Sequence, residues 1–324
     1  MRSVKGVARI RFAALLAVLC LAGSESGAAD PAGWGTDHVG KPMPEYMTGD
    51  ECLFCHRAKI GSSWQSNRHQ TTIRLLGADT AQARSAGGAA PLPETVEFVL
   101  GRTNQLRFLK RSDHYGQLDL LHSPSPEPPA RPDHARPGAD ATWEADTFGD
   151  RCAGCHATAV ETQSRAFATV GIDCFACHGD VDRHHTQAPE RALLARERND
   201  PALVIISICG SCHLRSGRSR STGRPYANQF VPGDNLFLDF EVDLSDSAIE
   251  RAPAIDRHIL ANVRDVVQAS LNAVTCLTCH LVHRGGSFKH RRLSARSSCW
   301  TCHDGAIDKL IPGWSAASGT VCGY

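Results

Sequence analysis

The sequence repeats one short pattern, Cys-x-x-Cys-His, six times along its 324 residues. This pattern is typical of covalent attachment of c-type haem, because each copy supplies two thiols and one imidazole. Residues three and four apart share one face of a helical turn, so both thiols reach the porphyrin vinyl groups while the histidine meets the iron. The sequence therefore predicts six covalently bound haem c groups. The predicted attachment cysteines are Cys52, Cys55, Cys152, Cys155, Cys174, Cys177, Cys209, Cys212, Cys276, Cys279, Cys299 and Cys302, and the predicted proximal iron ligands are His56, His156, His178, His213, His280 and His303.

Paired cysteines also occur in zinc ribbons and fingers, which place no demand on the residue after each pair. Here a histidine follows every pair. Chance placement of the 14 cysteines and 16 histidines gives only about 0.03 such motifs in a chain of this length. The repeated histidine favours haem attachment over zinc or a disulfide framework.

Residues 1–29 have the layout of a secretory signal: basic residues, an apolar stretch from Phe12 to Ala22, and small residues before a cleavage site near Ala29. Cys20 raises the alternative of a lipid anchor, but a bulky Leu19 precedes it where acylation sites favour a small residue. We therefore predict a periplasmic protein whose signal, with Cys20, is removed. Cys322 is then the one cysteine left over, and we interpret it as incidental.

Composition limits the class of partner. The formal net charge is +1 before haem propionates are added, which argues against nucleic acid. Aromatic residues make up only 6% of the chain, so large side chains are too few to fill the core alone, and the haems are expected to form much of it. Beyond the signal there is no apolar stretch of 18 residues, so we expect no transmembrane helix.

The spacing of the motifs suggests an organisation. Residues 30–122 would form a region around the first haem, 123–140 a proline-rich linker, and 141–324 a region holding the second to sixth haems. Motifs two and three, and motifs five and six, are each separated by about twenty residues, which keeps their haems close together.

The expected fold is mainly α-helical with much irregular chain, packed around haem, and it includes a small β-hairpin. Alternating apolar residues in Thr95–Leu100 and Leu106–Leu109, separated by a turn at Gly101–Asn104, predict that hairpin. Helical spacing of apolar residues predicts one long helix over Asp246–Ala273, kinked or started near Pro253.

Histidine is the only residue abundant enough to complete six irons, because Met43 and Met47 are the methionines left after the signal. His283 follows His280 by three residues on the same helical face, so it would serve a neighbouring haem. We predict sixth ligands at His69, at His283 and at one of His184 and His185. Further candidates are His258 and His290, and we interpret His38, His114, His122 and His134 as surface or hydrogen-bonded residues.

Three segments resemble the multihaem cytochrome c family that includes the tetrahaem electron acceptor of hydroxylamine oxidoreductase. They are Cys52–His56 with Trp64–His69, the motif pair within Cys152–His185, and Val274–His283 followed by Cys299–His303. The resemblance covers most of residues 45–303, with Asn67 standing where that family often has serine. It implies a haem-packed, mainly helical electron-transfer chain in which His69 and a histidine after the third motif bind iron.

These features predict an extracytoplasmic hexahaem cytochrome that passes single electrons between redox partner proteins through closely spaced bis-histidine haems. The alternative is an oxidoreductase that acts on a small nitrogen or sulfur compound at one five-coordinate haem. A third interpretation is a polymerising cytochrome with a partly structural role. Peripheral association with a quinol-linked or outer-membrane partner stays open, and no nucleic-acid partner is expected.

Overall fold

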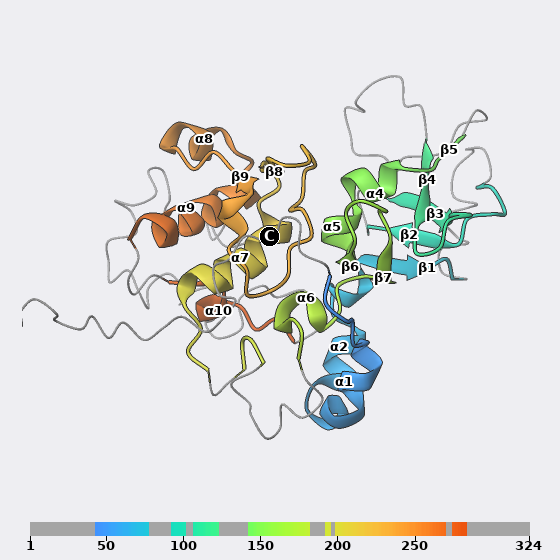
Figure 1. Cartoon of the computed structure of the whole chain (residues 1–324), viewed down its shortest axis with the longest axis horizontal. Helices are drawn as coiled ribbons and strands as arrows, with labels where there is room; N and C mark the ends of the chain where they lie inside the picture. The colour runs from blue at the N-terminus through green and yellow to red at the C-terminus, as the bar shows by residue number, and fades with distance from the viewer. Residues whose placement is uncertain are drawn as a thin grey trace, which may run out of the picture. The chain divides into compact units, whose positions relative to one another are not determined.

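A computed structural model describes residues 43–77, 92–101, 106–122, 142–181, 192–195, 198–269 and 274–283 (Figure 1). The predicted signal at 1–29, the proline-rich segment at 123–140 and the sixth motif lie outside the described residues. The same holds for Cys20, Met1, Cys322, His38, His134, His184, His185, His290 and His303.

Helices are mostly short, and five of them contain or end at a Cys-x-x-Cys-His motif. They are α1 (Gly49–His56), α2 (Ser62–Gln65), α4 (Thr147–Arg151), α5 (Ala153–His156), α6 (Phe175–His178), α7 (Ala202–His213), α8 (Asp246–Arg251), α9 (Ala254–Ala269) and α10 (Cys276–Cys279), with a π-helical turn η1 (Arg57–Gly61) and the 3-10 turns η2 (Gln70–Thr72) and η4 (Leu236–Leu238).

An antiparallel sheet of five strands, in the order β1-β2-β3-β4-β5, follows the first motif. Its strands are β1 (Ile73–Leu75), β2 (Phe98–Leu100), β3 (Arg107–Arg111), β4 (Leu118–His122) and β5 (Thr142–Glu144). β2 and β3 pair in the segments predicted as a hairpin, with Phe98 opposite Leu109, while the turn at 102–105 lies outside the described residues. The sheet is larger than the hairpin read from the sequence.

Successive residues of a strand point to opposite sides of the sheet. Because successive residues of these strands are apolar, both faces of the sheet carry apolar side chains. Phe98, Leu109 and Leu120 pack in one cluster with Phe148 of α4 and Ala153 of α5. The neighbouring strand residues Val99, Phe108 and Leu121 pack in a second cluster, with Leu92, Val96 and Leu106. The first cluster seats motif two directly against the sheet.

β5 comes after the segment predicted as a linker, yet it pairs with β4, which comes before it. Leu121 lies opposite Trp143 in this pairing. The two regions that the sequence suggested, 30–122 and 141–324, therefore share one sheet.

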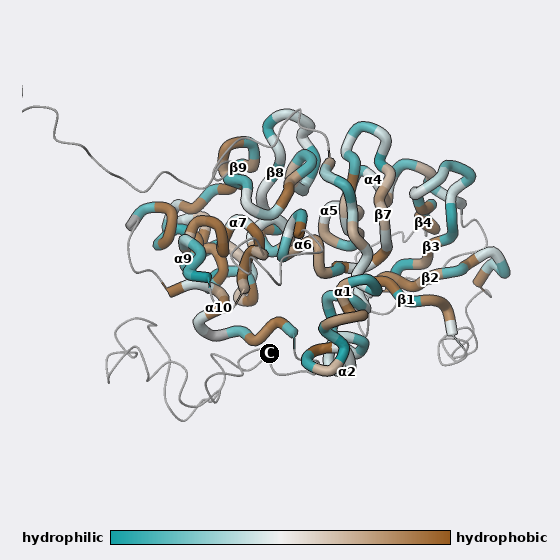
Figure 2. Tube along the Cα trace, turned by 60° about the horizontal axis from the view of Figure 1, so that its bottom comes forward, coloured by the Kyte–Doolittle hydropathy of each residue, from teal (hydrophilic) through white to brown (hydrophobic). Residues whose placement is uncertain are grey.

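α7 is apolar around most of its surface, as Figure 2 shows, and Ile206 within it is fully buried. Leu260 and Val263 of α9 pack with Ile206 in a cluster that also holds Leu236 and Phe240. Such an all-round apolar helix needs burial on several sides. The cluster fixes α7, and with it the fourth motif at its C-terminal end.

The helix predicted over Asp246–Ala273 is two helices, α8 and α9, in the structure. Ala252 ends α8 with an extended backbone (φ −65°, ψ 152°). A proline disfavours helical geometry in the residue before it, so Pro253 accounts for the break. Residues 270–273 lie outside the described residues.

A second, two-stranded sheet joins motifs two and three. β6 (Ala157–Val160) starts immediately after His156 and pairs antiparallel with β7 (Phe167–Val170). Gly171 then turns the chain with φ +79°, and a Cβ there would lie 2.3 Å from the carbonyl oxygen of Gln70. Only glycine fits this position. A third small sheet pairs β8 (Arg218–Ser219) with β9 (Phe240–Glu241).

In the part of the chain that the structure describes, no helix combines the length and apolar character needed to cross a membrane.

Candidate functional site

Each described motif occupies a helical turn and places its histidine at or just after the end of that turn. α1, α5, α6 and α7 end at His56, His156, His178 and His213, and His280 follows α10 directly. In α1 the hydroxyl of Thr48 caps the helix by accepting from Glu51 N at 3.4 Å. These turns put the thiols and the imidazole of one motif on one face, as covalent haem attachment requires.

Thiols from motifs far apart in the sequence meet in the structure. The Cys52 thiol of motif one lies close enough to the Cys174 thiol of motif three for each to shift the pKa of the other. Cys155 of motif two and Cys212 of motif four are related in the same way, and the Cys212 thiol donates to the Gly154 carbonyl of motif two at 3.6 Å. A third pair joins Cys209 of motif four to Cys276 of motif five. These pairs connect motif one to motif three and join motifs two, four and five, and the influence of Cys212 on the pKa of Cys177 connects the two groups.

A hollow lies among motifs two, three and four. Its volume is about 60 Å³, and it is lined by Gly154, Ala176 and Cys212 of the three motifs together with Ile172 and Phe230. The hollow is thus a small gap at which three motifs meet, with the Cys212 thiol of motif four in its lining.

His69 and His213 face each other although they come from different motif regions. Their ring centroids are 6.2 Å apart and the ring planes are inclined at 81°. Two metal–imidazole bonds of about 2 Å, with about 1 Å from each bonding nitrogen to its ring centre, predict a separation of about 6 Å across one metal ion. His69 and His213 would therefore be able to hold one iron between them.

His178 and His283 form a second pair of the same kind. Their ring centroids are 5.8 Å apart, with an interplanar angle of 27°. Trp64 lies at the edge of the His283 ring, with centroids 6.2 Å apart. The ring nitrogen Nδ1 of His178 is hydrogen-bonded to the carbonyl oxygen of Leu193, which orients the ring.

The electrostatic environment favours neutral imidazole, the form that binds metal. Burial lowers the pKa of His69, His156 and His283. Burial, with contributions from His69 and Arg215, lowers the pKa of His213 to about 4. Burial likewise raises the pKa of the partly buried Cys177 thiol to about 12.

The neighbouring thiols and the neighbouring imidazoles are residue types that would hold covalently bound haem. In motifs three and four, the motif histidine lies beside a second histidine from another part of the chain. The side chain of Cys279 and all of motif six lie outside the part of the chain that the structure describes. The chemistry that haem would supply at these motifs is a one-electron iron couple.

Asp173 connects motif one to motif three. Its carboxylate accepts hydrogen bonds from the Tyr46 hydroxyl, from Gly49 N at 2.7 Å and from Cys174 N at 2.7 Å. A Cβ on Gly49 would lie 1.9 Å from a carboxylate oxygen of Asp173, so only glycine allows this approach. The contacts keep the two motif helices together.

Thr158 makes the corresponding link between motifs two and three. It is 1% exposed, its hydroxyl donates to the Gly171 carbonyl at 2.8 Å, and the same oxygen accepts from Asp173 N at 2.9 Å. A buried hydroxyl with both donor and acceptor satisfied rigidifies its surroundings. This explains why threonine follows the second motif by two residues.

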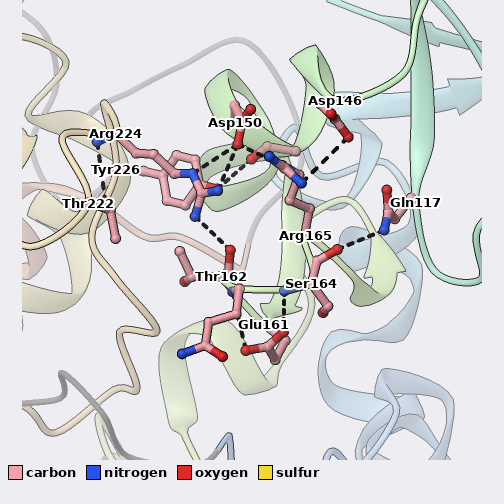
Figure 3. Close-up of polar contacts among 12 residues, drawn as sticks. Gln117, Asp146, Asp150, Glu161, Thr162, Ser164, Arg165, Thr222, Arg224 and Tyr226 are labelled. Carbon is pink, nitrogen blue, oxygen red and sulfur yellow. Dashed lines mark hydrogen bonds and ion pairs between the residues drawn. The ribbon is translucent and has the colours of Figure 1, made fainter.

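An ionic network holds motif two against the segment after motif four (Figure 3). Asp150, two residues before Cys152, accepts from Arg165 Nε at 2.8 Å and from Arg224 Nη2 at 2.7 Å. Although burial acts in the opposite direction, these hydrogen bonds hold the pKa of Asp150 below its usual value. The Tyr226 hydroxyl donates to the Gly149 carbonyl, and the Tyr226 ring packs so close to Gly154 that a Cβ there would lie 2.2 Å away.

The other described spare histidines differ in their surroundings. His114 is exposed on the turn between β3 and β4. His122 pairs through Nδ1 with the Glu144 carboxylate at 2.6 Å on the neighbouring strand. His258, on α9, and His280 both lie close enough to influence the pKa of His213. His258 is thus placed near motifs four and five, while the predicted ligands His184, His185 and His290 lie outside the described residues.

Sequence patterns did not single out Thr158, Asp173 or Leu193, although each holds a motif in place. In the sequence, the position of Thr158 and Asp173 beside a motif was the feature that could have indicated such a role. Among the described residues, no three His, Cys, Asp or Glu side chains converge as they would around a bare metal ion.

Comparison with known proteins gave limited results. No protein-family model matches the chain, and no curated protein matches it. A search of solved structures found an undecaheme cytochrome from the S-layer of Carboxydothermus ferrireducens, with a TM-score of 0.41 and 16% sequence identity. The match covers 82% of this chain and 44% of the cytochrome, so the chain spans less than half the length of that protein.

Proposed function

We propose that this protein is an extracytoplasmic hexahaem c-type cytochrome that carries single electrons between redox partner proteins. The observation that carries the proposal is the presence of two pairs of neighbouring imidazoles, His69 with His213 and His178 with His283. An iron with histidine on both sides has no open position for a substrate, which suits electron transfer rather than substrate chemistry.

The imidazole pairs also support an assignment of distal ligands to motifs. His69, although it follows motif one, is the distal ligand for motif four, and His283, although it follows motif five, is the distal ligand for motif three. His283 also lies close enough to His56 to be influenced by it, but its ring contact is with His178. Distal ligands lent across motifs lock the cofactor sites into one unit.

Contacts between motifs support a branched route for electrons. Thiol pairs join motif one to three, two to four and four to five. Motifs three and four are close as well, because Cys212 influences the pKa of Cys177. Phe54 is 89% exposed and Cys55 is exposed, so motif one is the described motif that best meets a partner protein at the surface.

We place the protein outside the cytoplasm because residues 1–29 have the layout of a secretory signal. Covalent haem attachment uses free thiols, and the proposal places that attachment outside the reducing cytoplasm. Bis-histidine ligation without methionine further predicts low potentials that lie close together.

The test is the spin state of the oxidised protein, produced with a cytochrome c maturation system. We expect a low-spin spectrum without a high-spin charge-transfer band, and no binding of cyanide by the native protein. Redox titration should give overlapping one-electron steps. A native haem that binds cyanide tightly would instead support the oxidoreductase alternative.

A further inference from the structure

Asn67 lies between the two distal histidines and is 2% exposed. It follows α2, where its backbone N–H donates to the Trp64 carbonyl at 2.8 Å and its own carbonyl accepts from Thr71 N and the Thr71 hydroxyl at 3.0 and 2.7 Å. These contacts hold the Asn67 backbone rigidly. Its side chain is left to make contacts with residues outside this turn.

The orientation of the Asn67 amide is fixed by chemistry. The nitrogen Nδ2 donates to the carbonyl oxygen of Val282, which can only accept, so the amide cannot be reversed. The oxygen Oδ1 must then face His69. It accepts from the His69 backbone N–H at 2.9 Å and lies 3.3 Å from the His69 ring nitrogen Nδ1.

This orientation sets the tautomer of His69. Because Oδ1 of an amide can only accept, the proton of a neutral His69 ring belongs on Nδ1. Nε2 is then the unprotonated nitrogen, available to bind iron in a ring whose centroid lies 6.2 Å from that of His213. The backbone of His69 is fixed on its other side, since its carbonyl accepts from Ile172 N at 3.1 Å.

The amide nitrogen Nδ2 of Asn67 contacts the segment that carries His283. Val282, whose carbonyl accepts from Nδ2, is the residue immediately before His283. Trp64, three residues before Asn67, supports the edge of the His283 ring. Thus one buried side chain contacts the distal histidine of motif four directly and holds the backbone beside the distal histidine of motif three.

We propose that Asn67 is a positioning residue shared by two haem sites: its oxygen orients His69 and its amide nitrogen anchors His283. The inference rests on the proposed function and deepens it. It makes the two sites dependent on one side chain, so that a single substitution alters both. A serine at this position has a hydroxyl too short to bridge the same two groups.

The experiment compares three variants of the holoprotein by electron paramagnetic resonance. Imidazole planes near perpendicular, as for His69 and His213 at 81°, give a highly anisotropic low-spin signal, whereas planes near parallel, as for His178 and His283 at 27°, give a rhombic one. Asn67→Leu removes both the amide oxygen Oδ1 and the amide nitrogen Nδ2 with little change in side-chain volume. Asn67→Asp keeps an oxygen toward His69 and removes the donor to Val282. Asn228→Leu is the control, because its amide only donates to the Ser221 hydroxyl at 3.0 Å.

We expect Asn67→Leu to change both signals, because removing a group that orients a metal ligand weakens metal binding about 10–100-fold. The weakened ligands should also let the reduced protein bind carbon monoxide, which the native protein should not bind. Asn67→Asp should change the rhombic signal and retain the highly anisotropic one. Asn228→Leu should leave both unchanged.

Unchanged signals in both Asn67 variants, or equal changes in Asn228→Leu, would overturn the shared role. If Asn67→Leu yields no holoprotein, Asn67→Asp provides the test. Loss of the highly anisotropic signal in Asn67→Asp would contradict the assignment of Oδ1 to His69 and of Nδ2 to the segment of His283. A wild-type protein that lacks the two low-spin signals would instead refute the proposed ligand pairs, whatever the variants do.

Discussion

The imidazole rings of His178 and His283 lie 5.8 Å apart, although one closes the third motif and the other follows the fifth. His283 cannot serve His280, its neighbour in sequence, from the opposite side of a porphyrin, because the two residues are too close along the chain. The structure brings it instead to a motif about a hundred residues earlier, and Trp64 from the first motif region supports its ring. Three separate parts of the chain thus meet at one imidazole.

Replacing this histidine should open one iron. We expect His283→Ala to convert one haem to a high-spin form that binds cyanide, while the native protein does not. Absorption and magnetic circular dichroism spectra of the oxidised protein would measure the change. His114→Ala is the matched control, since His114 is exposed. A low-spin spectrum in His283→Ala would show that the ring is not a ligand.

His69→Ala tests the other pair and should affect a different haem. The planes of His69 and His213 are nearly perpendicular, so we expect the variant to lose one haem's share of the highly anisotropic low-spin signal and to keep the rhombic signal in full. Electron paramagnetic resonance of both single variants, and of the double variant, would count the opened irons. If both single variants lose the same signal, the assignment of one histidine to each motif is wrong.

The helical turns at the motifs could be read from the sequence because their spacing itself demands them. The break before Pro253 was readable too, since proline acts on the residue that precedes it. The five-stranded sheet was not, because β1 and β5 have only three residues each and lie far along the chain from β2 to β4. So short a strand carries too little alternation to be recognised without its neighbours.

The candidate ligands followed from counting histidines, but their partners did not. That His69 faces His213 depends on backbone hydrogen bonds such as the one from Ile172 N to the His69 carbonyl, which no local pattern announces. The same is true of Asp173 and Thr158, whose roles arise from contacts between motifs. An isolated polar residue next to a motif looks the same whether it points to solvent or joins two sites.

Haem stoichiometry is the most direct check on the motif count. Intact mass of the processed protein, made with a cytochrome c maturation system, should show six haem additions. Cys276→Ala with Cys279→Ala removes one motif's thioether links and should reduce the number to five. A peptide map with an unmodified motif in the wild-type protein would contradict the prediction.

Asp173→Ala should loosen the link between motifs one and three. The carboxylate accepts from the Tyr46 hydroxyl and from the backbone at Gly49 and Cys174, so its loss leaves donors without partners. Each such group costs about 1–3 kcal/mol, and we expect the free energy of unfolding of the holoprotein to fall by at least that amount. Denaturant unfolding followed by circular dichroism measures it, with exposed Asp113→Ala as control. Equal stability of the two variants would mean that Asp173 does not hold the motifs together.

The ion pairs of Asp150 predict a dependence on pH. Hydrogen bonds from Arg165 and Arg224 keep its pKa below the ordinary value near 3.8, against the effect of burial, so the unfolded chain takes up the proton first as pH falls. The contribution of Asp150 to stability is therefore complete above about pH 5 and is lost as pH falls through the lowered pKa. We expect Asp150→Asn to be less stable than wild type at pH 6 and to approach it at pH 3. Because the side chain is about one-third exposed, added salt should reduce the difference at pH 6. A difference that stays constant between pH 6 and pH 3 would show that packing of the side chain, and not its charge, joins motif two to the segment after motif four.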